Sequence, residues 1–368
     1  MFELRVVQAD FGDSLILVHA ANGPPRHVLI DGGPAGVYDP HLRSELRRIR
    51  NAGGDLELVV LSHVDTDHVT GLLDFFAELQ DQRANGLPET IPVAALWHNS
   101  FARTIDDGGG IQNRLRTALA LAQTATMPNA MAGVMGIGEG QRLRLLAAQL
   151  EVPVNQGFPA DLICVDDAPA PIQLGGLTLR VVGPTRANLE ELRGKWEEWL
   201  DDNEPALQSG DPRLMANADQ SIPNLSSIML LAECDGRTVL LTVDGRSDHL
   251  LKGLAAANLL DAEGKLHVDV LKVAHHGSDR NATKTFFRKV TADTYVISAN
   301  GNPDNPDLAT LIWIVEAAEQ RGEEIDILAT NQTPALTKLV EEYPPDELGY
   351  ELEVMAEDLH AETLTLAP

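Results

Sequence analysis

Residues 56–73 read LELVVLSHVDTDHVTGLL, an apolar run that stops abruptly at a group of histidines and aspartates. The run from Leu56 to Leu61 is short, β-branched at its centre and bounded by polar residues, which is typical of a strand buried on both faces. Polar residues dominate from Ser62 to His68, and the pattern from Gly71 onward predicts a helix. The strand-to-helix turn therefore carries four side chains of the metal-binding type, namely His63, Asp65, Asp67 and His68.

Imidazoles and carboxylates are the donors that bind borderline and hard divalent cations. Because these donors lie within six residues, they can converge on one point without help from distant segments. A solvated turn in which aspartates cap the helix is the alternative interpretation. For the pattern His-x-Asp-x-Asp-His directly after a buried strand, we favour a metal site.

The same pattern resembles the signature of the metallo-β-lactamase fold, in the version found in the hydrolase domain of the DNA-uptake competence protein ComEC and its soluble relatives. Four further segments resemble that group in order and approximate spacing: 7–14 (VQADFGDS), 28–33 (VLIDGG), 240–245 (LLTVDG) and 271–278 (LKVAHHGS). The resemblance implies an α/β protein, a four-layer αββα sandwich of metallo-β-lactamase type.

The chain is interpreted as a single domain, 1–368, with a first half at 1–97 and a second half at 171–368. Residues 98–170 have no counterpart in the family. Their Ala/Leu-rich patterns predict a helical insertion over the mouth of the site, where substrate choice is often made. Strands are expected at Leu4–Val7, Leu15–His19, His27–Ile30, Pro92–Trp97, Leu177–Val182, Thr238–Val243 and Val268–Val273, with one or two closing strands in Glu351–Leu366.

The composition limits the partners. Twenty-eight basic against fifty-five acidic residues give a formal charge of −27, which repels phosphate backbones, so we expect no tight nonspecific binding to duplex nucleic acid. No apolar run is long enough to cross a bilayer and the N-terminus has no signal-like pattern, which predicts a cytoplasmic protein without membrane association. Cys164 and Cys234 lack a metal-type spacing and are expected to be small buried residues.

The resemblance also implies roles for residues outside the central turn. It places Asp31 beneath the metal turn, where hydrogen bonds would support the ligands. Asp244 ends a predicted strand, and its two carboxylate oxygens make it the natural bridge between two cations. Asn224 falls where many family members have a metal-binding histidine, but it offers only a neutral carbonyl oxygen, so it is a candidate for substrate or loose metal binding.

Histidines 275 and 276 follow another predicted strand. Consecutive strand residues point to opposite faces, so we expect one of them, His276 by alignment, to bind metal and the other to face the substrate as a general acid. Ser278 can donate to an anionic oxygen. His98 is expected to be a packed or capping residue outside the site. The family's Gly-His-Pro is replaced here by Asp304-Asn305-Pro306, which leaves the identity of the substrate open.

These residues predict a hydrolase with two divalent metal ions, Zn or Mn, and a metal-bridging hydroxide. One ion would take His63, Asp65, Asp244 and either Asn224 or water, and the other Asp67, His68, Asp244 and His276 or His275. The candidate catalytic residues are Asp67, His275 and His276.

The resemblance favours a phosphodiesterase or nuclease-like enzyme acting on an anionic small molecule or a nucleic acid. A carboxylic ester, lactone or thioester hydrolase of the same fold is the first alternative. A non-catalytic binding module, with the helical insertion as its protein-partner surface, is the second.

Overall fold

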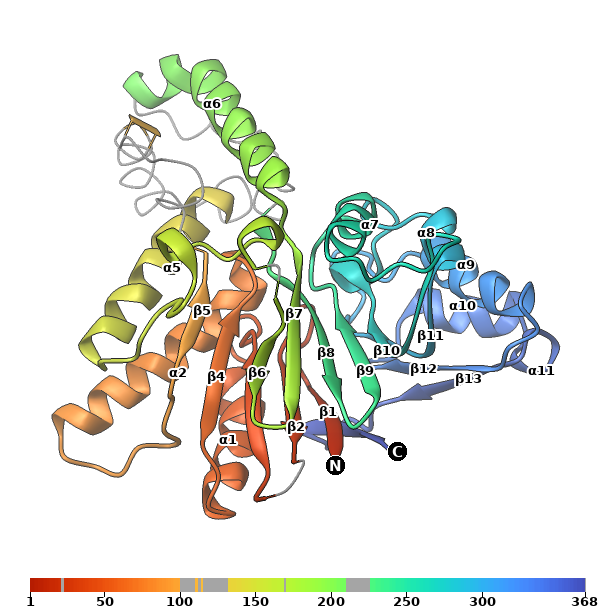
Figure 1. Ribbon diagram of the computed structural model, residues 1–368, viewed down its shortest axis with the longest axis horizontal. Coiled ribbons are helices and arrows are strands. Elements are labelled where there is room, and N and C mark those ends of the chain that lie inside the picture. Colours follow the sequence, from red (N-terminus) through yellow and green to blue (C-terminus); the bar gives the residue numbers. More distant parts are fainter. Residues whose placement is uncertain are drawn as a thin grey trace.

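The computed structural model describes residues 1–20, 23–99, 110–111, 114, 132–168, 170–209 and 226–367, with the side chains of 132–137 and 203–209 left aside. In this part of the chain, two sheets carry the strands (Figure 1). The first sheet has the order β14-β1-β2-β3-β4-β5 and the second the order β13-β12-β11-β10-β9-β8-β7-β6.

The first sheet is built from β1 (Phe2–Val7), β2 (Leu15–His19), β3 (Arg26–Ile30), β4 (Leu56–Leu61), β5 (Leu96–His98) and β14 (Ala361–Leu366). The second is built from β6 (Ile172–Leu174), β7 (Leu177–Gly183), β8 (Met229–Cys234), β9 (Arg237–Leu241), β10 (Leu266–Lys272), β11 (Val290–Ile297), β12 (Ile325–Ala329) and β13 (Tyr350–Val354). The helices are η1 (Tyr38–Leu42), α1 (Arg43–Asn51), α2 (Thr66–Ala84), α5 (Ala132–Gln149), η3 (Pro159–Asp161), η4 (Val165–Asp167), α6 (Arg186–Ser209), α7 (Ser247–Ala256), η7 (Ala274–Gly277), α8 (Lys284–Lys289), α9 (Leu308–Glu319), α10 (Pro334–Glu342) and α11 (Pro345–Leu348).

Strand β4 shows why the sequence selects this arrangement. Leu58 and Val60 belong to the apolar core shared with the second sheet, whereas Val59 and Leu61 belong to a separate core with helices α1, α2 and α5. Side chains alternate along a strand, so the stretch from Leu58 to Leu61, which is apolar at every position, can fill both cores. The predicted strand Leu56–Leu61 is confirmed at both ends.

The closing strands of the chain divide between the two sheets. Strand β13 pairs with β12, whereas β14 pairs antiparallel with β1, so that Leu366 lies opposite Phe2. Both termini consequently lie side by side at one end of the molecule (Figure 1). The predicted strand Pro92–Trp97 is wrong in its bounds, because Val93 forms only an isolated bridge with Leu56 and the strand itself begins at Leu96.

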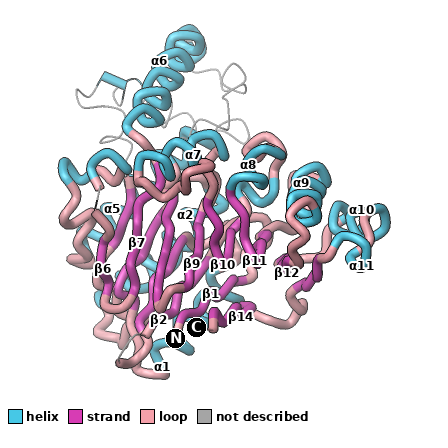
Figure 2. Tube along the Cα trace, turned by 45° about the vertical axis from the view of Figure 1, so that its right-hand side comes forward, coloured by secondary structure: helices cyan, strands magenta, loops and turns pink. Residues whose placement is uncertain are grey.

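Of the predicted helical insertion, α5 lies among the described residues, and most of the segment 100–131 lies outside them. Helix α5 packs on α2 through Leu143, Leu146 and Ala147. Helix α6 extends away from the sheets in both views (Figures 1 and 2). Its Trp196 and Trp199 are buried with ring centroids 5.5 Å apart, as packing anchors would be. Among the described helices, none is both long enough and apolar enough to cross a membrane.

Candidate metal centre

The turn after β4 is held by close backbone contacts. Gly32 donates to the carbonyl of His68 and Gly71 donates to the carbonyl of Gly33, each at 2.9 Å. A Cβ on Gly71 would lie 1.9 Å from the Gly32 oxygen, so any larger residue would separate the two segments. Helix α2 begins at Thr66, immediately after Asp65, which places His68 on the first turn. The turn is therefore tied to the segment after β3 by backbone contacts.

Two parallel strands of the second sheet bring the remaining donors to the same rim. Leu241 at the end of β9 lies opposite Lys272 at the end of β10. Three residues beyond this matched pair, the two strands reach Asp244 and His275. The amide of His275 donates to the carbonyl of Val243 at 2.8 Å, so the two loops are joined directly.

Asp244 is buried at the centre of the donors, with one carboxylate oxygen toward each group. Its Oδ2 lies 3.7 Å from His63 Nε2 and 3.6 Å from His275 Nε2, and His63 Nε2 lies 3.5 Å from Asp65 Oδ2. We call His63, Asp65, Asp244 and His275 the first donor set.

The second donor set consists of Asp67, His68, Asp244 and His276. Asp244 Oδ1 lies 3.5 Å from His68 Nε2 and 3.6 Å from His276 Nε2. Asp67 Oδ2 lies 3.6 Å from His68 Nε2 and 3.2 Å from His276 Nε2. A tetrahedral ion with bonds of about 2.0–2.1 Å has donors about 3.3–3.4 Å apart, close to these separations.

Several of the donor atoms lack a hydrogen-bond partner among the described residues. Within the described part of the chain, the Nε2 atoms of His63, His68 and His276 and Oδ1 of Asp244 are buried without a hydrogen-bond partner. Buried polar atoms of this kind are costly unless something pairs with them. The residues present therefore fit a divalent cation.

Hydrogen-bond acceptors at Nδ1, the ring nitrogen that faces away from the centre, fix the tautomer of three histidines. Nδ1 of His68 donates to Asp31 Oδ2 at 2.8 Å and Nδ1 of His276 donates to the carbonyl of Ser298 at 2.9 Å. Ser62 Oγ donates to Asp31 Oδ2 at 2.6 Å and can then accept from Nδ1 of His63 at 3.0 Å. In each ring the proton lies on Nδ1, which leaves the Nε2 lone pair for a cation.

The charges around the rings also favour a cation. Burial would lower the pKa of His276, but Asp244, Asp13 and Asp67 outweigh it and raise the value to about 10. Burial is likewise outweighed at His68, whose pKa Asp244, Asp67 and Asp31 raise well above its usual range. The site holds more negative charge than its protein partners neutralise.

The alternation argument for the two adjacent histidines is wrong. His275 and His276 lie in the short helix η7 rather than in a strand, and both adopt the left-handed conformation with φ of 48° and 56°. Both Nε2 atoms consequently reach Asp244 at 3.6 Å, one at each oxygen. His275 is the more exposed of the two, with 30% of its side chain accessible.

The other predicted residues have mixed outcomes. Asp31 lies beneath the turn and also accepts from the amide of Ser62 at 2.8 Å. Ser278 ends η7 and is buried. Asn224 lies outside the described residues. Asn305, in place of the family's histidine, donates from Nδ2 to the carbonyl of His275 at 3.3 Å.

Residues that sequence reasoning missed include Asp13. One ligand-type atom from each of Asp13, His68, Asp244 and His276 lies within 4.8 Å of the others. Lys272, fully buried, donates from Nζ to Asp13 Oδ2 at 2.7 Å. Both residues lie in the segments 7–14 and 271–278 that resemble the family, so the signal was present in the sequence but gave no role.

Helix α5 brings two further groups close to the turn. Gly140 approaches Val64 and His98 so closely that a Cβ there would lie 2.8 Å from Val64 Cγ1 and 3.1 Å from His98 Nε2. Burial raises the pKa of the neighbouring Glu139 to about 7, with Asp65 adding to the effect. Burial and the charge of Arg144 lower the pKa of His98 to about 3, in keeping with a packed, neutral ring.

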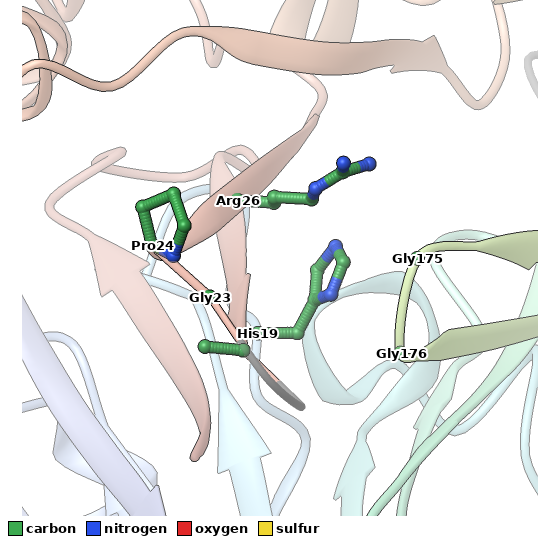
Figure 3. Close-up of a pocket in the computed structure, with 7 residues that line it drawn as sticks. His19, Gly23, Pro24, Arg26, Gly175 and Gly176 are labelled. Atoms are coloured by element: carbon green, nitrogen blue, oxygen red, sulfur yellow. The ribbon is translucent and has the colours of Figure 1, made fainter.

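A pocket of about 350 Å³ lies at the other end of β4, lined by His19, Ala20, Gly23, Pro24, Arg26, Gly175 and Gly176 (Figure 3). The His19 ring and the Arg26 side chain lie on the side of the Gly175–Gly176 turn. Glu57 accepts from Arg26 Nη1 at 2.6 Å and lies 3.4 Å from His19 Nε2. Glu57 is near the first residue of β4 and His63 follows the last, so the length of the strand, roughly 20 Å, separates this pocket from the donor sets.

Comparisons with known proteins agree with the site in part. Residues 11–108 match the family model described as the metallo-beta-lactamase superfamily, which identifies a domain of that superfamily in this part of the chain. No curated protein matches the chain. Among solved structures, a protein of unknown function from Enterococcus faecalis V583 is 10% identical over 98% of this chain and 79% of that one, with a TM-score of 0.29, on which we rest no argument.

The superfamily domain and the buried histidines and aspartates together indicate a metal-dependent hydrolase with divalent cations as cofactors.

Proposed function

We propose that this chain is a four-layer αββα sandwich of metallo-β-lactamase type, in a single domain, and a dinuclear hydrolase that acts on phosphodiesters. The observation that carries the proposal is the division of the donors into two sets, each containing one oxygen of Asp244. The shared core between the sheets, and the separate core with α1, α2 and α5, support the layered fold.

The charge of the centre supports two ions rather than one. Among the described residues, it gathers five carboxylates, Asp13, Asp31, Asp65, Asp67 and Asp244, against the single ammonium of Lys272. Four negative charges remain, which two divalent cations would neutralise. A neutral centre accepts an anionic substrate that the centre without cations would repel.

The protein's own residues would hold the cations and orient the histidine rings that bind them. When bound, the cations supply Lewis acidity that makes water a nucleophile near neutral pH and stabilises negative charge on the reacting group. Asp244 would hold both ions. Asp31 orients the ring of His68 directly and the ring of His63 through Ser62. His275 is the donor nearest to solvent among the histidines of the two sets, so it defines where a substrate would enter.

One assay tests both the metal, zinc or manganese, and the phosphodiester substrate. Protein saturated with either metal should hydrolyse bis-p-nitrophenyl phosphate or short single-stranded oligonucleotides, and Asp67→Asn should lose that activity while remaining folded. Failure of the fully metallated wild-type protein on every such substrate would contradict the phosphodiesterase proposal.

A second candidate is a carboxylic ester, lactone or thioester hydrolase, which the formal charge of −27 favours because it disfavours polyanionic substrates. Turnover of a lactone or thioester panel, with none of phosphodiesters, would select it. Both candidates require the same pair of donor sets.

A further inference from the structure

Lys272 and Asp13 form a fully buried ion pair between the sheets. Asp13 lies in the turn between β1 and β2 of the first sheet, and Lys272 is the last residue of β10 in the second. Each is 0% exposed, and the ammonium also donates to the carbonyl of Val273 at 3.0 Å. A lysine is almost never kept out of water unless it is paired, so this pair calls for an explanation.

The pair lies against the back of His276. Asp13 Oδ1 is 3.6 Å from Nδ1 of His276, the ring atom opposite the Nε2 that belongs to the second donor set. Oδ1 is buried and has no hydrogen-bond partner among the residues that the structure describes, while Oδ2 accepts from Lys272. Negative charge on this side of the ring stabilises the positive charge that the ring gains when Nε2 donates its lone pair.

The same turn also contacts Asp67, which belongs to the second donor set, and Ser298, which accepts from His276. The amide of Asp13 donates to the carbonyl of Asp67 at 3.3 Å. Gly12 lies so close that a Cβ on it would be 2.1 Å from that oxygen. Ser298 donates from Oγ to the carbonyl of Gly12, and its own carbonyl accepts from His276. Asp13 is thus placed by the residues that it would help to position.

We propose that Asp13 and Lys272 act as a positioning pair for the second donor set, in which Lys272 holds the Asp13 carboxylate against the Nδ1 edge of His276. The proposal rests on the proposed metal centre. Lys272 donates from Nζ to Asp13 Oδ2 at 2.7 Å, and its positive charge offsets the cost of burying the carboxylate. Direct binding of an ion by Asp13 is the competing role, because its carboxylate lies within 4.8 Å of the ligand-type atoms of His68, Asp244 and His276.

The test compares Asp13→Asn, Lys272→Met and the double variant with the wild-type protein. Ion number at saturation is measured by metal analysis, and the affinity of each ion by competition between Zn²⁺ and a chromogenic chelator. We expect two ions at saturation in all variants. One ion should be bound about 10–100-fold more weakly and the other unchanged, as for partners behind metal ligands.

The double variant should bind the affected ion no more weakly than the single variant with the lower affinity, because the two residues act as a unit. It also removes both charges together, so it decides the question if the unpaired Asp13 in Lys272→Met prevents folding. Asp269→Asn is the matched control, since Asp269 lies at the middle of β10 and pairs with Arg237 at 2.6 Å, away from the donor sets. This control should bind both ions as the wild type does.

Wild-type affinities in Asp13→Asn and the double variant would overturn the proposal. So would saturation of Asp13→Asn at one ion while Lys272→Met binds as the wild type does, because that result makes Asp13 a ligand. Two ions bound by the wild-type protein without hydrolysis of any substrate would contradict the proposed function alone, and the affinity comparison would still decide the role of the pair.

Discussion

Histidines and carboxylates meet at both ends of β4, but their surroundings differ. After the last residue of the strand, aspartates raise the pKa of His63, His68 and His276 in spite of burial. Near the first residue, burial lowers the pKa of His19 and lowers that of His27 to about 4. The decisive difference is neutralisation: Glu57 has Arg26 as its partner, whereas the five carboxylates at the metal centre exceed the charge of Lys272 by four. A cluster of such residues indicates a cation only where the carboxylates outnumber the protein's own cations.

Replacing the shared carboxylate should have the largest effect. Asp244→Asn removes the charge from both donor sets at once. Since the loss of a partner behind a metal ligand already costs about 10–100-fold, we expect hydrolysis to fall by roughly 10³-fold or more. Metal analysis should find fewer than two ions per chain.

The control for this change lies at the other end of the same strand. Glu57→Gln should retain both ions and full activity, since Glu57 interacts with Arg26 and His19 only at the far pocket. A loss of ions in Glu57→Gln equal to that in Asp244→Asn would remove the distinction between the two ends.

Metal removal should lower the stability of the folded protein only through the donor sets that follow the last residue of β4. A ligand present at about 100 times its Kd stabilises the folded state by about 2.7 kcal/mol, so chelation should lower the Tm of the wild-type protein by several degrees. Differential scanning calorimetry with and without chelator measures this shift. Glu57→Gln should show the same shift and Asp244→Asn little or none; an equal shift in all three proteins would place the ions elsewhere.

Near the first residue of β4, the contribution to stability should depend on pH rather than on metal. Burial and the charge of Arg5 lower the pKa of His27 to about 4 from the ordinary 6.5, so the folded state binds fewer protons than the unfolded state between these values. His27 therefore contributes stability above pH 6.5 that is lost as the pH falls toward 4, on the order of 3 kcal/mol. Urea unfolding of chelated protein at pH 7, 5.5 and 4.5 should show a smaller loss in His27→Gln than in the wild type. Parallel losses would show that His27 is not the residue responsible.

The smallest effect is expected at the rim of the far pocket. Arg26 has 52% of its side chain exposed, and an exposed ion pair is worth only about 0–1 kcal/mol. Arg26→Gln should therefore change the free energy of unfolding by less than about 1 kcal/mol and leave ion binding unaltered. Weaker ion binding in this variant would show that the two ends of β4 are coupled.

The sequence allowed much of the site to be predicted because its donors are local. Four of them lie within six residues after β4, and the strand itself could be recognised from its apolar run. Asp244 and the two adjacent histidines follow strands whose parallel pairing brings their ends together. For such residues the periodicity of the chain carries the information.

Other features depend on contacts that no local pattern encodes. Asp13 and Lys272 are 259 residues apart, so nothing near Asp13 indicates the cation that keeps it ionised. The left-handed turn at His275 and His276 broke the alternation that was expected of a strand. The predicted partner surface on the insertion stays a prediction, because most of residues 100–131 lie outside the described chain.

The division of Asp244 between two ions is tested most directly by anomalous diffraction from crystals grown with Zn²⁺ or Mn²⁺. We expect two peaks, one among His63, Asp65, Asp244 and His275, and the other among Asp67, His68, Asp244 and His276. Saturated crystals with no peak at these residues, or with one peak that Asp244 does not contact, would contradict the account.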